Sequence, residues 1–160
     1  MTRKASVSRV GLRACLVGGA TWIGLLAMVL SNIGAAACSV RAPSGVAFGS
    51  YNVFSMQDTL SAGSVEVTCD QPFSITLNAG ANSNDYHARR MLGPSGYLSY
   101  NLYSNVTHTA VWVDSSDLAH AVAGQGTGQV ETFNVYGLIP AGQNVSVGTY
   151  SDSILVLVTF

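Results

Sequence analysis

Short alternating segments separated by turn residues constrain this chain more than any other feature. In "SVEVTCD" the residues Val65, Val67 and Cys69 share one face, which is the period of a half-buried β-strand. The same alternation recurs in "FSITLNA" (Phe73, Ile75, Leu77), "YLSYNLYS" (Leu98, Tyr100, Leu102) and "VETFNVYG" (Phe133, Val135). Between these segments lie the turn-forming stretches "NAGANSND", "LGPSG", "AGQGTGQ" and "IPAGQNVSVG". No window sustains a capped helical period, so the sequence predicts an all-β antiparallel sandwich.

The chain ends on an apolar segment, about residues 150–160, with no polar tail after it. Ile154, Val156, Val158 and Phe160 fall on one face of an extended strand, and Leu155 and Leu157 fall on the other. Apolarity on both sides predicts a strand that is buried on both faces. An exposed strand of this kind would be prone to aggregation.

The first 37 residues have the layout of a secretory signal peptide. A basic start, "MTRKASVSRVGLR", precedes the uncharged run "ACLVGGATWIGLLAMVL" and an Ala-x-Ala ending. We predict cleavage after Ala37 and export by the Sec route to the periplasm and cell surface. The alternatives are an uncleaved membrane anchor, for which the apolar run is short, and a lipoprotein acylated at Cys38.

Removal of residues 1–37 would leave one domain, residues 38–160, with a formal charge of −5 from three arginines and eight acidic residues. This balance provides no basic surface for nucleic acid or anionic lipid. We therefore expect no nucleic-acid partner and no membrane insertion after cleavage.

Two cysteines, Cys38 and Cys69, remain in the predicted mature chain. An even pair in an oxidising compartment favours a disulfide. A zinc site is the alternative, but two cysteines without nearby histidines do not complete a zinc shell.

The polar residues form no catalytic constellation. His87, His108 and His120 are not spaced as a metal motif, and "GPSGY" around Ser95 is not a nucleophile elbow. "GQGTG" (Gly124, Gly126, Gly128) lacks the helix that a phosphate-binding loop requires, so we expect a hairpin loop there.

Two further pairs of charged residues stand out in the predicted mature chain. Asp114 and Asp117 are most simply a solvated turn, although a calcium loop or a glycosidase pair uses the same residue types. Arg89 and Arg90 could form a salt bridge across strands or bind a ligand. We predict no catalytic, cofactor-binding or metal site, and no enzyme.

Taken in order, several segments resemble the spore coat protein U domain family, which includes subunits of archaic (Csu-type) chaperone–usher pili. They are Cys38 with Val40, "FGSY", "GSVEVTC", "FSITLNAG", "RRML", "LSYNLYS", Trp112 and the closing "VYGLIPAGQNVSVGTYSDSILVLVTF". The resemblance covers essentially all of residues 38–160.

The resemblance implies an incomplete immunoglobulin-like sandwich whose missing strand comes from a partner. That strand would be lent by a periplasmic chaperone, and in a fibre assembled by an outer-membrane usher it would come from the neighbouring subunit. Ile154, Val156, Val158 and Phe160 would then border the partner-strand groove, and the function would be adhesion or biofilm formation.

One departure from the family pattern concerns the donor strand. Polymerising subunits carry a donor stretch before the first cysteine, whereas here Cys38 follows the predicted cleavage site at once. This difference predicts a fibre-terminal subunit or a coat protein that does not polymerise in this way. Cleavage several residues earlier, for example near Ile33, would instead leave a short donor strand. A self-contained secreted module that binds carbohydrate is the alternative, and a secreted hydrolase using Asp114 and Asp117 is a third hypothesis.

Overall fold

A computed structural model describes residues 4–7, 11–17, 37–113 and 122–160 of the chain. These residues form strands and no helices, as the alternating segments predict. The strands are β1 (Lys4–Val7), β2 (Gly11–Val17), β3 (Cys38–Ser44), β4 (Gly49–Asn52), β5 (Thr59–Cys69), β6 (Phe73–Leu77), β7 (Arg90–Gly93), β8 (Gly96–Ser99), β9 (Asn101–Tyr103), β10 (Val122–Gly124), β11 (Val130–Ile139), β12 (Thr149–Tyr150) and β13 (Ser153–Thr159). In this part of the chain there is no helix long and apolar enough to cross a membrane.

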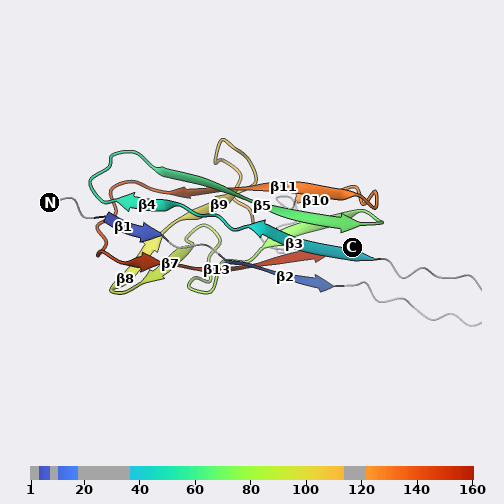
Figure 1. The fold of residues 1–160 in the computed structure, drawn as a ribbon, viewed down its shortest axis with the longest axis horizontal. Helices are drawn as coiled ribbons and strands as arrows, with labels where there is room; N and C mark the ends of the chain where they lie inside the picture. The colour runs from blue at the N-terminus through green and yellow to red at the C-terminus, as the bar shows by residue number, and fades with distance from the viewer. Residues whose placement is uncertain (1–3, 8–10, 18–36, 114–121) are drawn as a thin grey trace, which may run out of the picture.

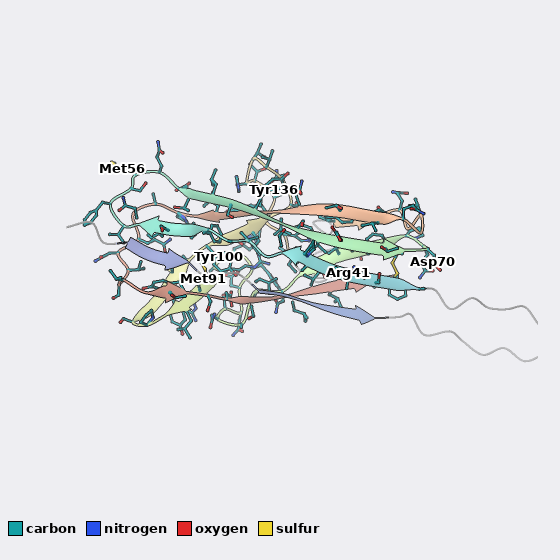
Figure 2. The ribbon with its side chains drawn as sticks, in the orientation of Figure 1. Arg41, Met56, Asp70, Met91, Tyr100 and Tyr136 are labelled. Carbon is teal, nitrogen blue, oxygen red and sulfur yellow. A yellow bond between two sulfur atoms is a disulfide. The ribbon has the colours of Figure 1, made fainter. Side chains whose placement is uncertain are left out.

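Two four-stranded sheets form the layers of an elongated sandwich (Figure 1). One sheet has the order β3-β5-β11-β9, and the other has the order β10-β6-β13-β2. Two smaller sheets, β12-β1-β4 and the hairpin β7-β8, continue the layers at one end. Met56 and Asp70 mark opposite ends of the molecule (Figure 2).

The core lies between the layers and contains the residues that the alternation predicts. Val65, Val67 and Cys69 of β5 are fully buried, and they belong to the same hydrophobic cluster as Ile75 and Leu77 of β6. The other predicted inward residues, Phe73, Leu98, Tyr100, Leu102 and Val135, are also buried, and Phe133 packs against the core. Figure 2 shows Met91 and Tyr100 between the layers.

The predicted disulfide joins the first strand of the predicted mature domain to the next strand in its sheet. Cys38 and Cys69 are direct partners in the antiparallel register of β3 and β5, and their Cα atoms are 4.3 Å apart. The bridge therefore ties the beginning of β3 to the buried end of β5.

Three predictions about individual faces and loops are wrong. Leu155 of β13 is 40% exposed, because the outer face of this strand is not fully covered. Asn101 alternates with the inward Tyr100 and Leu102, which predicts an outward position, but it is buried because its side-chain oxygen accepts a hydrogen bond from a buried arginine. The "GQGTG" segment is not a hairpin loop, because β10 pairs with β6 and β11 pairs with β5, so the segment connects the two sheets.

Candidate functional site

The site to which the sequence points is the edge of β13. Ile154, Val156 and Val158 are fully buried in the core, and Phe160 packs against it. On one side β13 pairs antiparallel with β6, from Val156 opposite Leu77 to Thr159 opposite Ser74. Its other side is the edge on which a partner strand would have to pair, and the role of these four residues as a groove stays a prediction.

That second side of β13 is occupied by β2, which belongs to the predicted signal peptide. The two strands are parallel, and they are paired residue by residue from Gly11 opposite Ser153 to Val17 opposite Thr159. Figure 1 shows β2 running beside β13 along the long axis, at the margin of the sandwich that also carries β3. Among the described residues from 38 to 160, only β6 pairs with β13.

The start of β13 is fixed by side chains from the β6 end. The amide of Asn78 donates to the carbonyl of Leu155 at 3.1 Å, and the side-chain oxygen of Asn78 accepts from the amide of Leu155 at 2.8 Å. The same oxygen accepts from the amide of Gly80 at 3.1 Å. Asn78 thus extends the pairing of β6 and β13 beyond the last strand residue, Leu77. A hollow of about 340 Å³, lined by Asn78, Ala81, Ser153, Ile154 and Leu155, lies beside this point.

A buried arginine holds Asn78 in place. Arg89 is fully buried and donates to the carbonyl oxygen of Asn78 from Nε at 3.1 Å and from Nη2 at 2.8 Å. It also donates to Asn101 Oδ1 at 2.8 Å and to the Trp112 carbonyl at 2.6 Å. The planar guanidinium is suited to this role because its five donors are fixed in a fork. Arg90, in contrast, is exposed and stacks on the ring of Tyr97 at 4.1 Å.

A buried carboxylate immediately precedes β13. Asp152 is 4% exposed, and its Oδ1 accepts from the amide of Ala81 and from Asn82 Nδ2, both at 2.9 Å. Its Oδ2 accepts from the hydroxyl of Tyr100 at 2.8 Å. Gly80 is left-handed, with φ +94°, and a Cβ there would collide with Asp152 Oδ2, so only glycine allows this packing.

The environment of Tyr100 keeps its hydroxyl protonated. Burial, together with the charge of Asp152 and the hydrogen bond to it, raises the pKa of Tyr100 above its usual value, while the charge of Arg89 opposes this rise. Tyr100 therefore acts as a hydrogen-bond donor to Asp152 at all ordinary pH values. Nothing in the local sequence marks Asp152 as buried, so this polar cluster could not be predicted from the sequence.

The other residues considered from the sequence as catalytic or metal-binding candidates do not lie together in one site. His87 is exposed, Ser95 is exposed in the turn between β7 and β8, and His108 lies between the rings of Tyr103 and Tyr136. Asp114, Asp117 and His120 lie outside the described residues. Among the described residues, no three His, Cys, Asp or Glu side chains are placed to hold a metal ion.

The "GQGTG" loop owes its shape to protein contacts. Glu131 accepts from the amide of Gln125 at 3.1 Å and from that of Gly126 at 2.8 Å, and the amide of Gly128 donates to the carbonyl of Cys69 at 2.7 Å. A Cβ on Gly124 would collide with the ring of Phe73. These glycines therefore serve close packing and the crossing between the sheets.

Comparison with known proteins shows two relationships. Protein U of Myxococcus xanthus is 32% identical over 147 residues, which cover 81% of this chain and 80% of that protein. A crystal structure of the CsuC–CsuE chaperone–tip adhesion subunit pre-assembly complex from archaic chaperone–usher Csu pili of Acinetobacter baumannii contains a chain with the same fold, at a TM-score of 0.52 and 19% identity. The match covers 78% of this chain and 40% of that chain.

The family follows from the length of the sequence match. The Spore Coat Protein U domain model matches residues 25–157, which include every strand of the sandwich from β3 to β12 and most of β13. The match in fold to a chain of the chaperone–subunit complex agrees with that assignment. The chain belongs to the spore coat protein U domain family.

Proposed function

We propose that residues 38–160 are an exported structural subunit of a surface fibre of the chaperone–usher type, used in adhesion or biofilm formation. Residues 1–37 are removed by signal peptidase after Sec export. The subunit then passes from a periplasmic chaperone to an outer-membrane usher, joins its neighbouring subunits and reaches the cell surface. No catalytic step is part of this role.

The observation that carries the proposal is the second side of β13. Within the described chain, only residues 11–17 pair with that side, and they belong to the segment that we propose is cleaved. Cleavage would leave seven residues, 153–159, with an unpaired backbone edge over a fully buried apolar face. Such an edge recruits a strand from another chain, because backbone hydrogen bonds supply affinity and alternate side chains supply specificity.

The position in the fibre follows from the N-terminus of the cleaved chain. Cys38 is the first residue of β3 and is bridged to Cys69, so residues from Cys38 onward are committed to the sandwich. A chain cleaved after Ala37 has no residues free to serve as a donor strand. We therefore place this subunit at a fibre end, and the solved relative with this fold belongs to a complex described as containing a tip adhesion subunit.

Periplasmic expression of the chain tests the proposal. Without a chaperone from the same gene cluster, the cleaved subunit should aggregate or be degraded; with it, a soluble one-to-one complex should accumulate. N-terminal sequencing of the complex should begin at Cys38. A stable monomer without any partner would contradict the assembly role, and a start well before Cys38 would contradict the fibre-end position alone.

A spore or cell coat protein is the second candidate, and the match to Protein U over 80% of its length favours it. A coat protein that completes its own sandwich would need no chaperone. The solubility of the cleaved chain therefore separates the two functions.

A further inference from the structure

The N-terminal segment follows one complete margin of the sandwich as two separate strands. β1 pairs parallel with β12, with Val7 opposite Tyr150, and on its other side it pairs antiparallel with β4. β2 then pairs parallel with β13 over its full length. Figure 1 shows the two strands in succession along the long axis, beginning at the end where β4 lies.

The register changes by one residue between these two strands. Two residues, Ser151 and Asp152, separate Tyr150 from Ser153, whereas three residues separate their partners Val7 and Gly11. A strand that pairs with both β12 and β13 therefore needs one more residue between its two paired parts than the two residues, Ser151 and Asp152, that separate β12 from β13.

The acceptor side explains why the pairing is divided. Ser151 is already paired with Leu92 of β7 by two backbone hydrogen bonds, of 2.9 and 3.0 Å. The carboxylate of Asp152 is held by Ala81, Asn82 and Tyr100. Ser151 is therefore paired with β7, and the side chain of Asp152 belongs to the buried polar cluster. These two residues interrupt the edge that β12 and β13 present to a pairing strand.

The sequence of β2 is apolar opposite the buried residues of β13. Leu12, Ala14 and Leu16 are the register partners of the buried Ile154, Val156 and Val158. The charged residue of the strand, Arg13, is the register partner of Leu155, which is one of the exposed residues of β13. Apolar residues thus occur in the segment at each position paired with a buried residue.

We infer that residues 4–7 and 11–17 form an internal complement to the β12–β13 margin, along which they pair in parallel in the uncleaved chain as two strands. Cleavage after Ala37 removes this strand and opens the margin to a partner. The inference rests on the proposed function, because an internal complementing strand matters only if cleavage leaves the edge of β13 unpaired. We expect a partner strand that pairs with both β12 and β13 to need the same one extra residue opposite Ser151 and Asp152.

Disulfide trapping in the full chain tests the orientation. In the parallel register Cys15 is the partner of Leu157, so Leu157→Cys should give a bridge from Cys15 to the introduced thiol in the oxidised protein. Leu155→Cys is the matched control, because an antiparallel strand centred on the same Ala14–Val156 pair would place Cys15 opposite residue 155. Peptide mapping should find the first bridge and not the second. The reverse pattern, or no bridge from Cys15 while Cys38 and Cys69 are oxidised, overturns the inference.

Deletion of one residue tests the divided register. Removing Ser8 shortens the spacer to the two residues found on the acceptor side, and should speed hydrogen exchange at residues 49–52 and 149–150 at least tenfold. Removing Thr2 shortens the chain equally but outside the paired residues, and should leave exchange unchanged. Equal exchange in the two deletion variants contradicts the two-part fit.

The chain 38–160 separates failure of this inference from failure of the proposed function. If 38–160 aggregates and the full-length Leu157→Cys variant forms no bridge from Cys15, the inference alone is wrong. If 38–160 is a stable monomer with residues 153–159 protected from exchange, the open edge does not exist and both are wrong.

Discussion

The side-chain oxygen of Asn78 accepts a hydrogen bond from the backbone amide of Leu155 at 2.8 Å, and the amide of Asn78 donates to the carbonyl of Leu155 at 3.1 Å. One residue thus satisfies both backbone groups of Leu155, immediately beyond the end of β6. This contact aligns the first residues of β13, where the margin for a partner strand begins.

Replacement of Asn78 by alanine should destabilise this alignment. Asn78→Ala leaves the amides of Leu155 and Gly80 without their acceptor, which costs about 1–3 kcal/mol of unfolding free energy. Urea unfolding of the full chain measures the effect. Asn134→Ala, at an exposed position of β11, is the matched control and should change stability by less than about 0.5 kcal/mol. Equal unfolding free energies of the two variants would show that Asn78 does not stabilise the start of β13.

The two adjacent arginines should behave differently. Arg89→Lys keeps the positive charge but loses the fork that binds Asn78, Asn101 and Trp112, so we expect a loss of about 1.5–3 kcal/mol. Arg90→Lys affects an exposed side chain stacked on Tyr97 and should cost at most about 1 kcal/mol. The unfolding midpoints of the two variants give the comparison, and a larger loss for Arg90→Lys would contradict it.

Stability should fall at alkaline pH because of Tyr100. Its pKa is raised in the folded chain, so the native state keeps a proton that the unfolded chain releases above about pH 10. The contribution of Tyr100 to stability is fully present below that pH. Above it, the unfolding free energy should drop by up to about 1.4 kcal/mol per pH unit.

The phenylalanine variant isolates that contribution. Tyr100→Phe removes the titrating group and should flatten the alkaline slope, although the lost bond to Asp152 lowers stability at neutral pH. Tyr97→Phe removes an exposed phenol and is the matched control, which should keep the wild-type slope. An alkaline slope unchanged by Tyr100→Phe would rule out this assignment.

The disulfide should contribute to stability mainly through the unfolded chain. Cys38 and Cys69 are 31 residues apart, a separation for which loop-closure entropy gives about 3.7 kcal/mol. Reduction with dithiothreitol, or the double change Cys38→Ser with Cys69→Ser, should lower the unfolding free energy of the full chain by about this amount. The same stability before and after reduction would show that the bridge is dispensable.

The sequence predicted the layers of the fold because alternation records which face of a strand is apolar. Val65, Val67 and Cys69 show this pattern clearly, and all three are buried. It could not predict Asn101 as buried, because polarity alone indicates an outward face. Asn101 accepts a hydrogen bond from Arg89, which is twelve residues away, and this bond can form only once β7 and β9 are packed.

The margin of the sandwich was predicted in part. The apolar face of β13 was evident from Ile154, Val156 and Val158, but Leu155 is partly exposed, since apolar composition does not tell whether anything covers the outer face. The position of Asp152 depends on contacts with Asn82 and Tyr100, which lie far away in the chain. The pairing of residues 4–7 and 11–17 was also missed, because a signal-like composition gives no indication of strand register.

Hydrogen exchange at residues 153–159 of the cleaved chain, 38–160, tests whether β13 has an open edge. We expect rapid exchange across this segment in the chain alone, and exchange slowed at least tenfold when the periplasmic chaperone is bound, while the paired strands β5 and β11 remain protected in both states. Protection of residues 153–159 equal to that of β5 and β11 in the chain alone would contradict an open edge at β13.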